Sequence, residues 1–230
     1  MSIEDQFVNN VLKYGLGFIR KCVGAVLLGC IFCANFSNAG NLGAQFIRAD
    51  LQYGASIDIP RSWRVLKGTE MQSIETAVGA AIDLSGYSKA VDGTETLLAS
   101  NSGDRNNYAG ITITTTKIPS VTPRFAEGLS DAQLKTVEGG ARQGVESIHT
   151  RMGVKIYGWT SMQKVSIGSR IAMKTSYLRK SEEGERRVHM YKFFGMGRMY
   201  DLALSTNLDG ELLNNVVLEK IVQSFSIDKK

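Results

Sequence analysis

Cysteine, proline and histidine are scarce in this chain, and the scarcity of cysteine excludes several classes of protein. The 230 residues contain three cysteines, three prolines and two histidines. The cysteines are Cys22, Cys30 and Cys33, so the chain from Gly40 onward has no disulfide framework, no thiol nucleophile and no cysteine metal site. Its stability must come from a hydrophobic core, which a domain of this size can build.

An excess of charge of one sign is also missing. The chain has 27 Lys and Arg residues against 22 Asp and Glu residues, a formal net charge of +5, and both signs are interspersed. Nucleic-acid-binding proteins usually show a basic face or stripe, so we expect no nucleic-acid partner. With 43% hydrophobic and 21% charged residues, the composition is that of an ordinary globular protein.

A long uncharged run stands near the N-terminus. A basic pair precedes the segment Cys22–Phe36, CVGAVLLGCIFCANF, and the small residues Ser37 and Ala39 follow it at the two positions that signal peptidase reads. The pattern predicts a signal peptide over residues 1–39, cleaved after Ala39, and a periplasmic mature protein. A retained membrane anchor is the alternative, although the run is shorter than the ~20 residues that a spanning helix needs.

Lipidation is a further interpretation of the same segment. Leu27-Leu28-Gly29-Cys30 has the outline of a bacterial lipobox, and acyl chains on Cys30 would anchor the protein to a membrane. Membrane contact is expected only in that case. The apolar stretch before Cys30 is short for this purpose, so we favour cleavage after Ala39.

From residue 40 the chain alternates between strand and helix patterns, which predicts a single domain over residues 40–230. The apolar spacing indicates helices at Thr69–Leu84, from a cap at Ser130 to Met152, and at Glu211–Phe225. In the last of these the inward side chains are expected to be Leu212, Leu213, Val216, Val217, Ile221 and Phe225. Strands are expected at Ser56–Pro60, Trp63–Leu66, Leu97–Ser100, Tyr108–Lys117, Ile156–Trp159, Lys164–Ile167, Arg170–Leu178, Arg187–Phe194 and Arg198–Ser205.

This order of elements favours an α+β fold. Strands joined by short turns, with helices inserted between groups of them, are typical of an antiparallel β-sheet flanked by helices, an α/β/α sandwich. Trp63 follows the corner at Pro60, where a large aromatic side chain is expected to fill the core.

Three stretches of the chain resemble the PsbP-like group, which includes the DcrB-like bacterial lipoproteins and the photosystem extrinsic proteins. They are SIDIPRSWRV (Ser56–Val65), MYDLALST (Met199–Thr206) and IVQSFSI (Ile221–Ile227). The resemblance implies an antiparallel sheet sandwiched by helices. It also implies a role as an assembly or accessory factor, since none of the three stretches is a catalytic signature.

Residues with catalytic or metal-binding potential are few. His149 lies beside the apolar stripe of the long helix, and His189 lies in an expected strand, and neither has a metal-ligand neighbour as in H-x-x-x-H. The stretch Gly195–Tyr200, GMGRMY, begins like a dinucleotide-binding loop but stands between two expected strands, which indicates a hairpin turn. We therefore expect no catalytic residue, no cofactor and no metal.

A partner-binding surface is expected instead. Trp159 follows Tyr157 and Gly158 near a strand end, where an exposed aromatic side chain suits an interface. The segment Arg179–Arg187 mixes charges around a turn, which predicts a solvated hairpin with cross-strand ion pairs whose arginines suit an acidic partner. The candidate surface residues are Trp159, Arg179, Lys180, Arg186 and Arg187.

Two classes of function are therefore open. The favoured one is an exported, non-enzymatic accessory or binding protein of the bacterial cell envelope that acts on an unidentified envelope protein. The alternative is a small-ligand binder or a hydrolase whose site is assembled from distant residues, with His149 or His189 as the base. A histidine within hydrogen-bond reach of Ser, Asp or Glu in a pocket would favour the hydrolase.

Overall fold

The computed structural model describes residues 45–66, 94–151, 153–181 and 184–228, which form two antiparallel sheets and their covering helices. Both the expected leader and the expected helix Thr69–Leu84 lie outside these ranges. The large sheet runs in the order β3 (Arg64–Val65), β4 (Thr94–Asn101), β5 (Ala109–Lys117), β10 (Arg198–Asn207), β9 (Gly184–Gly195), β8 (Arg170–Ser181) and β6 (Lys155–Tyr157), and β7 (Gln163–Ile167) also pairs with β8.

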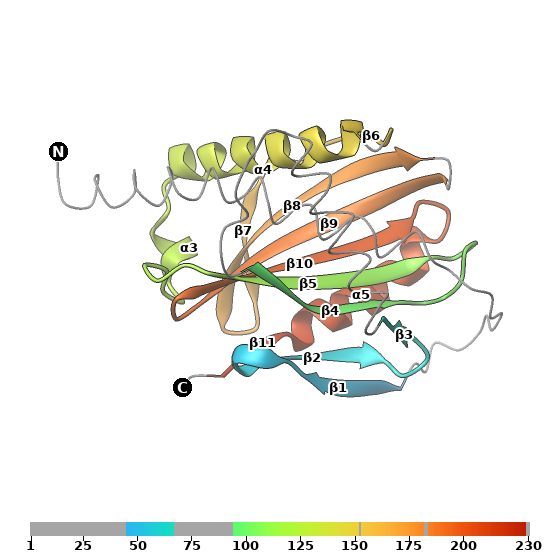
Figure 1. The fold of residues 1–230 in the computed structure, drawn as a ribbon, viewed down its shortest axis with the longest axis horizontal. Coiled ribbons are helices and arrows are strands. Elements are labelled where there is room, and N and C mark those ends of the chain that lie inside the picture. Colours follow the sequence, from blue (N-terminus) through green and yellow to red (C-terminus); the bar gives the residue numbers. More distant parts are fainter. Residues whose placement is uncertain (1–44, 67–93, 152, 182–183, 229–230) are drawn as a thin grey trace.

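A second, smaller sheet lies beneath the large one (Figure 1). Its order is β1 (Phe46–Asp50), β2 (Ala55–Pro60) and β11 (Ser226–Ile227), with the short 3-10 turn Gln52–Gly54 between β1 and β2. The helices are α3 (Phe125–Gly128), α4 (Asp131–Arg151) and α5 (Glu211–Ser224). Among these helices, none is both long and apolar enough to cross a membrane.

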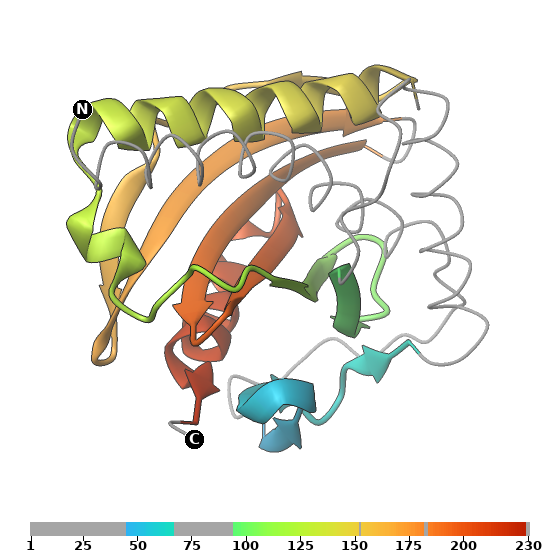
Figure 2. The same ribbon diagram turned by 60° about the vertical axis from the view of Figure 1, so that its left-hand side comes forward.

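α4 and α5 lie on opposite faces of the large sheet (Figures 1 and 2). The alternation of side chains along β9 explains this arrangement, because successive residues of a strand point to opposite faces. Val188 and Met190 pack with Val145 of α4, whereas Phe193 packs in the main core with Leu218 of α5. The predicted antiparallel α+β sandwich is therefore confirmed.

The N-terminus of α4 shows why a local pattern was sufficient to locate this helix. The backbone N–H of Gln133 donates to Ser130 Oγ (3.3 Å), and the backbone N–H of Ser130 donates to Gln133 Oε1 (2.7 Å). This reciprocal capping box satisfies two backbone donors at the helix start. The predicted cap at Ser130 is thus confirmed.

One detail of the predicted core is wrong, and another is confirmed only in part. Leu212 and Val216 were expected to face inward, but their side chains are 87% and 50% exposed, because α5 turns the stripe of Leu218, Ile221 and Val222 to the sheet instead. Trp63 packs against the main core but is only partly buried, since it lies in the tight turn after β2.

Candidate functional site

The predicted basic surface is divided between the two faces of the large sheet. Arg179 and Arg186 are register partners on β8 and β9, and they are only 6% and 5% exposed. The Nε of Arg186 donates to Asn207 Oδ1 (3.1 Å), and its guanidinium lies 4.1 Å from the centre of the Tyr108 ring. The prediction that these two arginines form part of an exposed surface is therefore wrong, because strand alternation directs them to the covered face.

Lys180 and Arg187 lie on the opposite face. Lys180 Nζ is 3.0 Å from Glu185 Oε1 across the β8–β9 hairpin, and the side chain of Lys180 is 61% exposed. The hydrogen bond and negative charge of Glu185 raise the pKa of Lys180, and Lys180 lowers the pKa of Glu185. Arg187 pairs with Glu211 at the start of α5, at 2.5 Å. Both basic side chains thus already have carboxylate partners within the chain.

Trp159 is attached to α4. Its indole Nε1 donates to Glu146 Oε1 (3.0 Å), and the same carboxylate oxygen pairs with Arg142 (2.8 Å). The indole ring packs 4.7 Å from the ring of Tyr177 and is only partly buried. Trp159 therefore joins α4 to the sheet.

His149 is a core residue of α4. Its side chain is fully buried, its Nδ1 lies 2.8 Å from the carbonyl oxygen of Val145, and its ring packs edge-on to Tyr177 at 5.8 Å. Burial, as the main cause, lowers the pKa of His149 from its ordinary value to about 3. No serine, aspartate or glutamate among the described residues forms a hydrogen bond with this ring.

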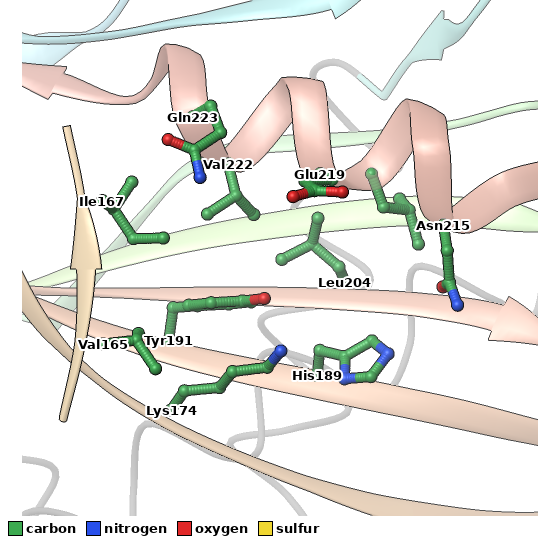
Figure 3. Close-up of a pocket in the computed structure, with 11 residues that line it drawn as sticks. Val165, Ile167, Lys174, His189, Tyr191, Leu204, Asn215, Glu219, Val222 and Gln223 are labelled. Atoms are coloured by element: carbon green, nitrogen blue, oxygen red, sulfur yellow. The ribbon is translucent and has the colours of Figure 1, made fainter. Parts of the chain in front are cut away.

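His189 instead lines a pocket of about 310 Å³ between α5 and strands β7 to β10 (Figure 3). Burial, assisted by the charges of Lys174 and Arg187 and opposed by Glu211, lowers the pKa of His189 to about 4. The other lining residues are Val165, Ile167, Lys174, Tyr191, Leu204, Asn215, Leu218, Glu219, Val222 and Gln223.

Two buried polar atoms in this pocket lack hydrogen bonds. Neither His189 Nδ1 nor Asn215 Oδ1 has a partner within the described ranges. Because almost all buried polar atoms in folded proteins are hydrogen-bonded, these atoms mark the pocket as the candidate site. Sequence reasoning singled out His189 but missed Asn215, since the helix that carries Asn215 and the strand that carries His189 are separate in the chain.

Metal ligands are not gathered anywhere in the parts of the chain that the structure covers. Within residues 45–66, 94–151, 153–181 and 184–228, no three His, Cys, Asp or Glu side chains lie close enough to hold an ion.

A buried ion pair does occur, between Lys192 of β9 and Asp201 of β10. It lies on the α4 face of the sheet, away from the pocket.

Comparison with known proteins identifies the fold. No protein-family model matches the sequence, and no curated protein matches it significantly. Cyanobacterial PsbP (CyanoP) from Synechocystis sp. PCC 6803 is similar in structure, with a TM-score of 0.53 and 12% identity over 84% of this chain and 99% of that chain.

Two further solved structures are similar at lower TM-scores. LpqN, involved in cell envelope biogenesis of Mycobacterium tuberculosis, has a TM-score of 0.41 and 13% identity over 81% of this chain and 92% of that chain. The Saccharomyces cerevisiae Ran-binding protein Mog1p has a TM-score of 0.40 and 9% identity over 80% of this chain and 96% of that chain. At such identities a likeness shows the fold alone, and the likeness to CyanoP confirms that this chain has the PsbP-like fold.

Proposed function

We propose that the protein is an exported, non-enzymatic accessory protein of the bacterial cell envelope that acts by binding another envelope protein. The observation that carries the proposal is an exposed apolar pair on α5. Leu212 and Val216 stand one helical turn apart and are 87% and 50% exposed. Large apolar side chains placed together on a surface are a common mark of an interface.

The α5 outer face, defined here as Leu212 and Val216, is held in a fixed orientation. Leu218, Ile221 and Val222 of the same helix are buried in the main core. The outer face is therefore presented by a rigid element, which lowers the entropy lost on binding. Two side chains supply only a small part of the ~800 Å² per partner of a standard interface, so this face suits the centre of a transient contact with a different protein rather than a stable dimer of this chain.

The histidines support the non-enzymatic part of the proposal. His149 is enclosed in the core, and His189 forms no hydrogen bond with a serine, aspartate or glutamate of the described residues. A general base needs such a partner to be oriented and a reacting group within reach. Export is supported by the signal-peptide pattern that ends at Ala39.

A crosslinking experiment tests the proposed contact. A photoreactive amino acid in place of Val216 is expected to capture one envelope protein in intact cells, and the added change Leu212→Glu is expected to abolish the capture. The same photoreactive group in place of Met196, which is 73% exposed in the β9–β10 turn, is the matched control.

Affinity measurement then decides whether the captured protein is a true partner. With both proteins purified, the double variant Leu212→Glu/Val216→Glu is expected to bind about 30-fold more weakly or worse, as for loss of an interface hot spot. Met196→Glu is expected to bind like the wild type. Equal binding by the wild type and the double variant would contradict the proposal.

A further inference from the structure

The two walls of the pocket carry polar groups of opposite kind. α5 contributes Asn215 and Glu219, whereas β8 and β9 contribute Lys174 and His189. Figure 3 shows the strand side chains directed towards the helix and the helix side chains directed towards the sheet. Carboxylate and amide oxygens accept hydrogen bonds and an ammonium group donates them, so the helix wall offers acceptors and the sheet wall offers a cationic donor.

Both walls have unmet hydrogen-bonding capacity. Asn215 Oδ1 on the helix wall and His189 Nδ1 on the sheet wall are buried without a partner in the described residues. Both residues line one pocket, so this pocket is the place where a ligand for these two atoms is to be sought. A ligand that does so must carry a donor for the amide oxygen of Asn215.

The pocket also contains one charge of each sign. Lys174 Nζ lies 5.3 Å from the centre of the Tyr191 ring, and neither Lys174 nor Glu219 forms an ion pair with a residue that the structure describes. His189 is neutral near pH 7, because its pKa is lowered to about 4. Lys174 and Glu219 are therefore available to a ligand's own charges.

Most of the remaining lining is aliphatic, and Tyr191 and Gln223 are the exceptions. Val165, Ile167 and Val222 lie at the end of the view in Figure 3 opposite His189 and Asn215. The volume of about 310 Å³ is at the lower end of the range of ~300–1,000 Å³ found for small-molecule sites. The end with His189 and Asn215 is thus polar, whereas the other end is mainly aliphatic, with the amide of Gln223 beside Val222. Such a pocket suits a small molecule with a polar part and an aliphatic part.

From these observations we propose that the pocket binds a free amino acid with a branched aliphatic side chain. The carboxylate of the ligand binds Lys174 and His189 on the sheet wall, and its ammonium group binds Asn215 and Glu219 on the helix wall. Its side chain contacts the aliphatic end of the pocket. This site is separate from the α5 outer face and goes beyond the proposed protein contact.

Ligands with a single charge fit less well. A simple carboxylate leaves Asn215 Oδ1 without a donor and brings a second negative charge near Glu219. A simple amine leaves Lys174 without a counter-charge and adds a second positive charge beside it. A zwitterion satisfies both walls at once, which makes the two single-charge analogues informative controls.

Isothermal titration calorimetry of the mature protein tests the ligand class. L-leucine is the probe, and its analogues are 4-methylpentanoate, which lacks the ammonium group, 3-methylbutylamine, which lacks the carboxylate, and glycine, which lacks the side chain. The two single-charge analogues are expected to bind about 10-fold more weakly than L-leucine or worse, the usual loss with a charged hydrogen bond. Glycine is expected to lose at least as much, because it buries no aliphatic side chain. No binding of L-leucine at about 10 mM, or equal binding of the analogues, would overturn the proposal.

Two variants test which wall of the pocket binds each charged group of the ligand. The affinity of the Lys174→Met variant for L-leucine is expected to be no higher than the affinity of the wild type for 3-methylbutylamine. The affinity of the Glu219→Gln variant for L-leucine is expected to be no higher than the affinity of the wild type for 4-methylpentanoate. Lys220→Met is the matched control, because Lys220 is an exposed lysine on α5 that does not line the pocket. Unchanged binding by folded Lys174→Met and Glu219→Gln variants would refute the site.

Nuclear magnetic resonance keeps the test independent of any variant's folding. Addition of L-leucine to the wild-type protein is expected to shift the amide signals of His189, Asn215 and Glu219, with little change at Met196. Shifts confined to other regions would place leucine elsewhere and overturn the proposal.

Discussion

The buried ion pair between Lys192 and Asp201 gives a strong prediction about stability. The two residues are register neighbours on β9 and β10, the Nζ of Lys192 donates to Asp201 Oδ1, and the side chains are only 1% and 5% exposed. Removal of one partner leaves a buried charge without its counter-charge, which costs about 3–5 kcal/mol. We therefore expect the Lys192→Met variant and the Asp201→Leu variant each to lose that much free energy of unfolding.

The double variant separates the pair's interaction from the cost of an unpaired charge. Lys192→Met/Asp201→Leu replaces both charges by apolar groups, a change that is often neutral for buried pairs. Its loss of stability is expected to be well below the sum of the two single losses. Urea denaturation measures all of these values, because domains are typically stable by ~5–15 kcal/mol.

An exposed pair on the other face is the control. Lys180 and Glu185 pair across the neighbouring β8–β9 hairpin and are largely exposed to solvent, where ion pairs contribute little. Lys180→Met is expected to leave the urea midpoint almost unchanged. The reasoning would be refuted if either buried single variant lost less than about 0.5 kcal/mol, the range of ordinary surface changes, or if the two losses were additive in the double variant.

Three further predictions follow from individual residues. Gly110→Ala is expected to cost about 1–3 kcal/mol in urea denaturation, because a Cβ there would stand 2.5 Å from the Tyr108 hydroxyl; wild-type stability would show that the ring moves aside freely. The pKa of His149 is about 3 in the folded protein against an ordinary 6.5, so its contribution to stability is complete above pH 6.5 and is lost as the pH falls towards 3. His149→Gln is expected to flatten this part of the stability profile, and an unchanged slope would contradict that assignment. Intact-mass analysis of the exported protein is expected to show a chain that begins at Gly40, and a species with acyl chains on Cys30 would contradict cleavage after Ala39.

Features determined by neighbouring residues were predictable from the sequence. The capping box at Ser130 needs only a serine and a glutamine three residues later. The turn between β9 and β10 needs only Gly195–Gly197 between two β-branched and aromatic runs, and Gly197 adopts a positive φ of 66° there. β1 and β11 were not predicted, since β1 is mostly exposed and β11 has two residues.

Features that depend on packing between distant elements were not predictable. α5 has apolar residues around much of its circumference, so the sequence allows more than one apolar stripe and does not show which one meets the sheet. Leu212 was therefore assigned to the wrong side. Arg179 and Arg186 are charged, as surface residues usually are, and lie in strands whose side chains alternate between two faces. Only the tertiary structure shows that the face to which they point is covered. The pocket joins Asn215 of a helix to His189 of a strand, and no local motif connects them.

The position of α5 links the two proposed binding events. Asn215 and Glu219 line the pocket, while Leu212 and Val216 of the same helix face solvent. An amino acid that bridges α5 and the sheet would strengthen the attachment of the helix to the core, and a partner on the outer face would bind a helix already held in place. Such coupling is reciprocal, because a ligand that raises the affinity for a partner is itself bound more tightly in the complex by the same factor. The affinity of the partner with and without saturating L-leucine therefore measures the coupling directly, and equal affinities would show that the pocket and the α5 outer face act independently.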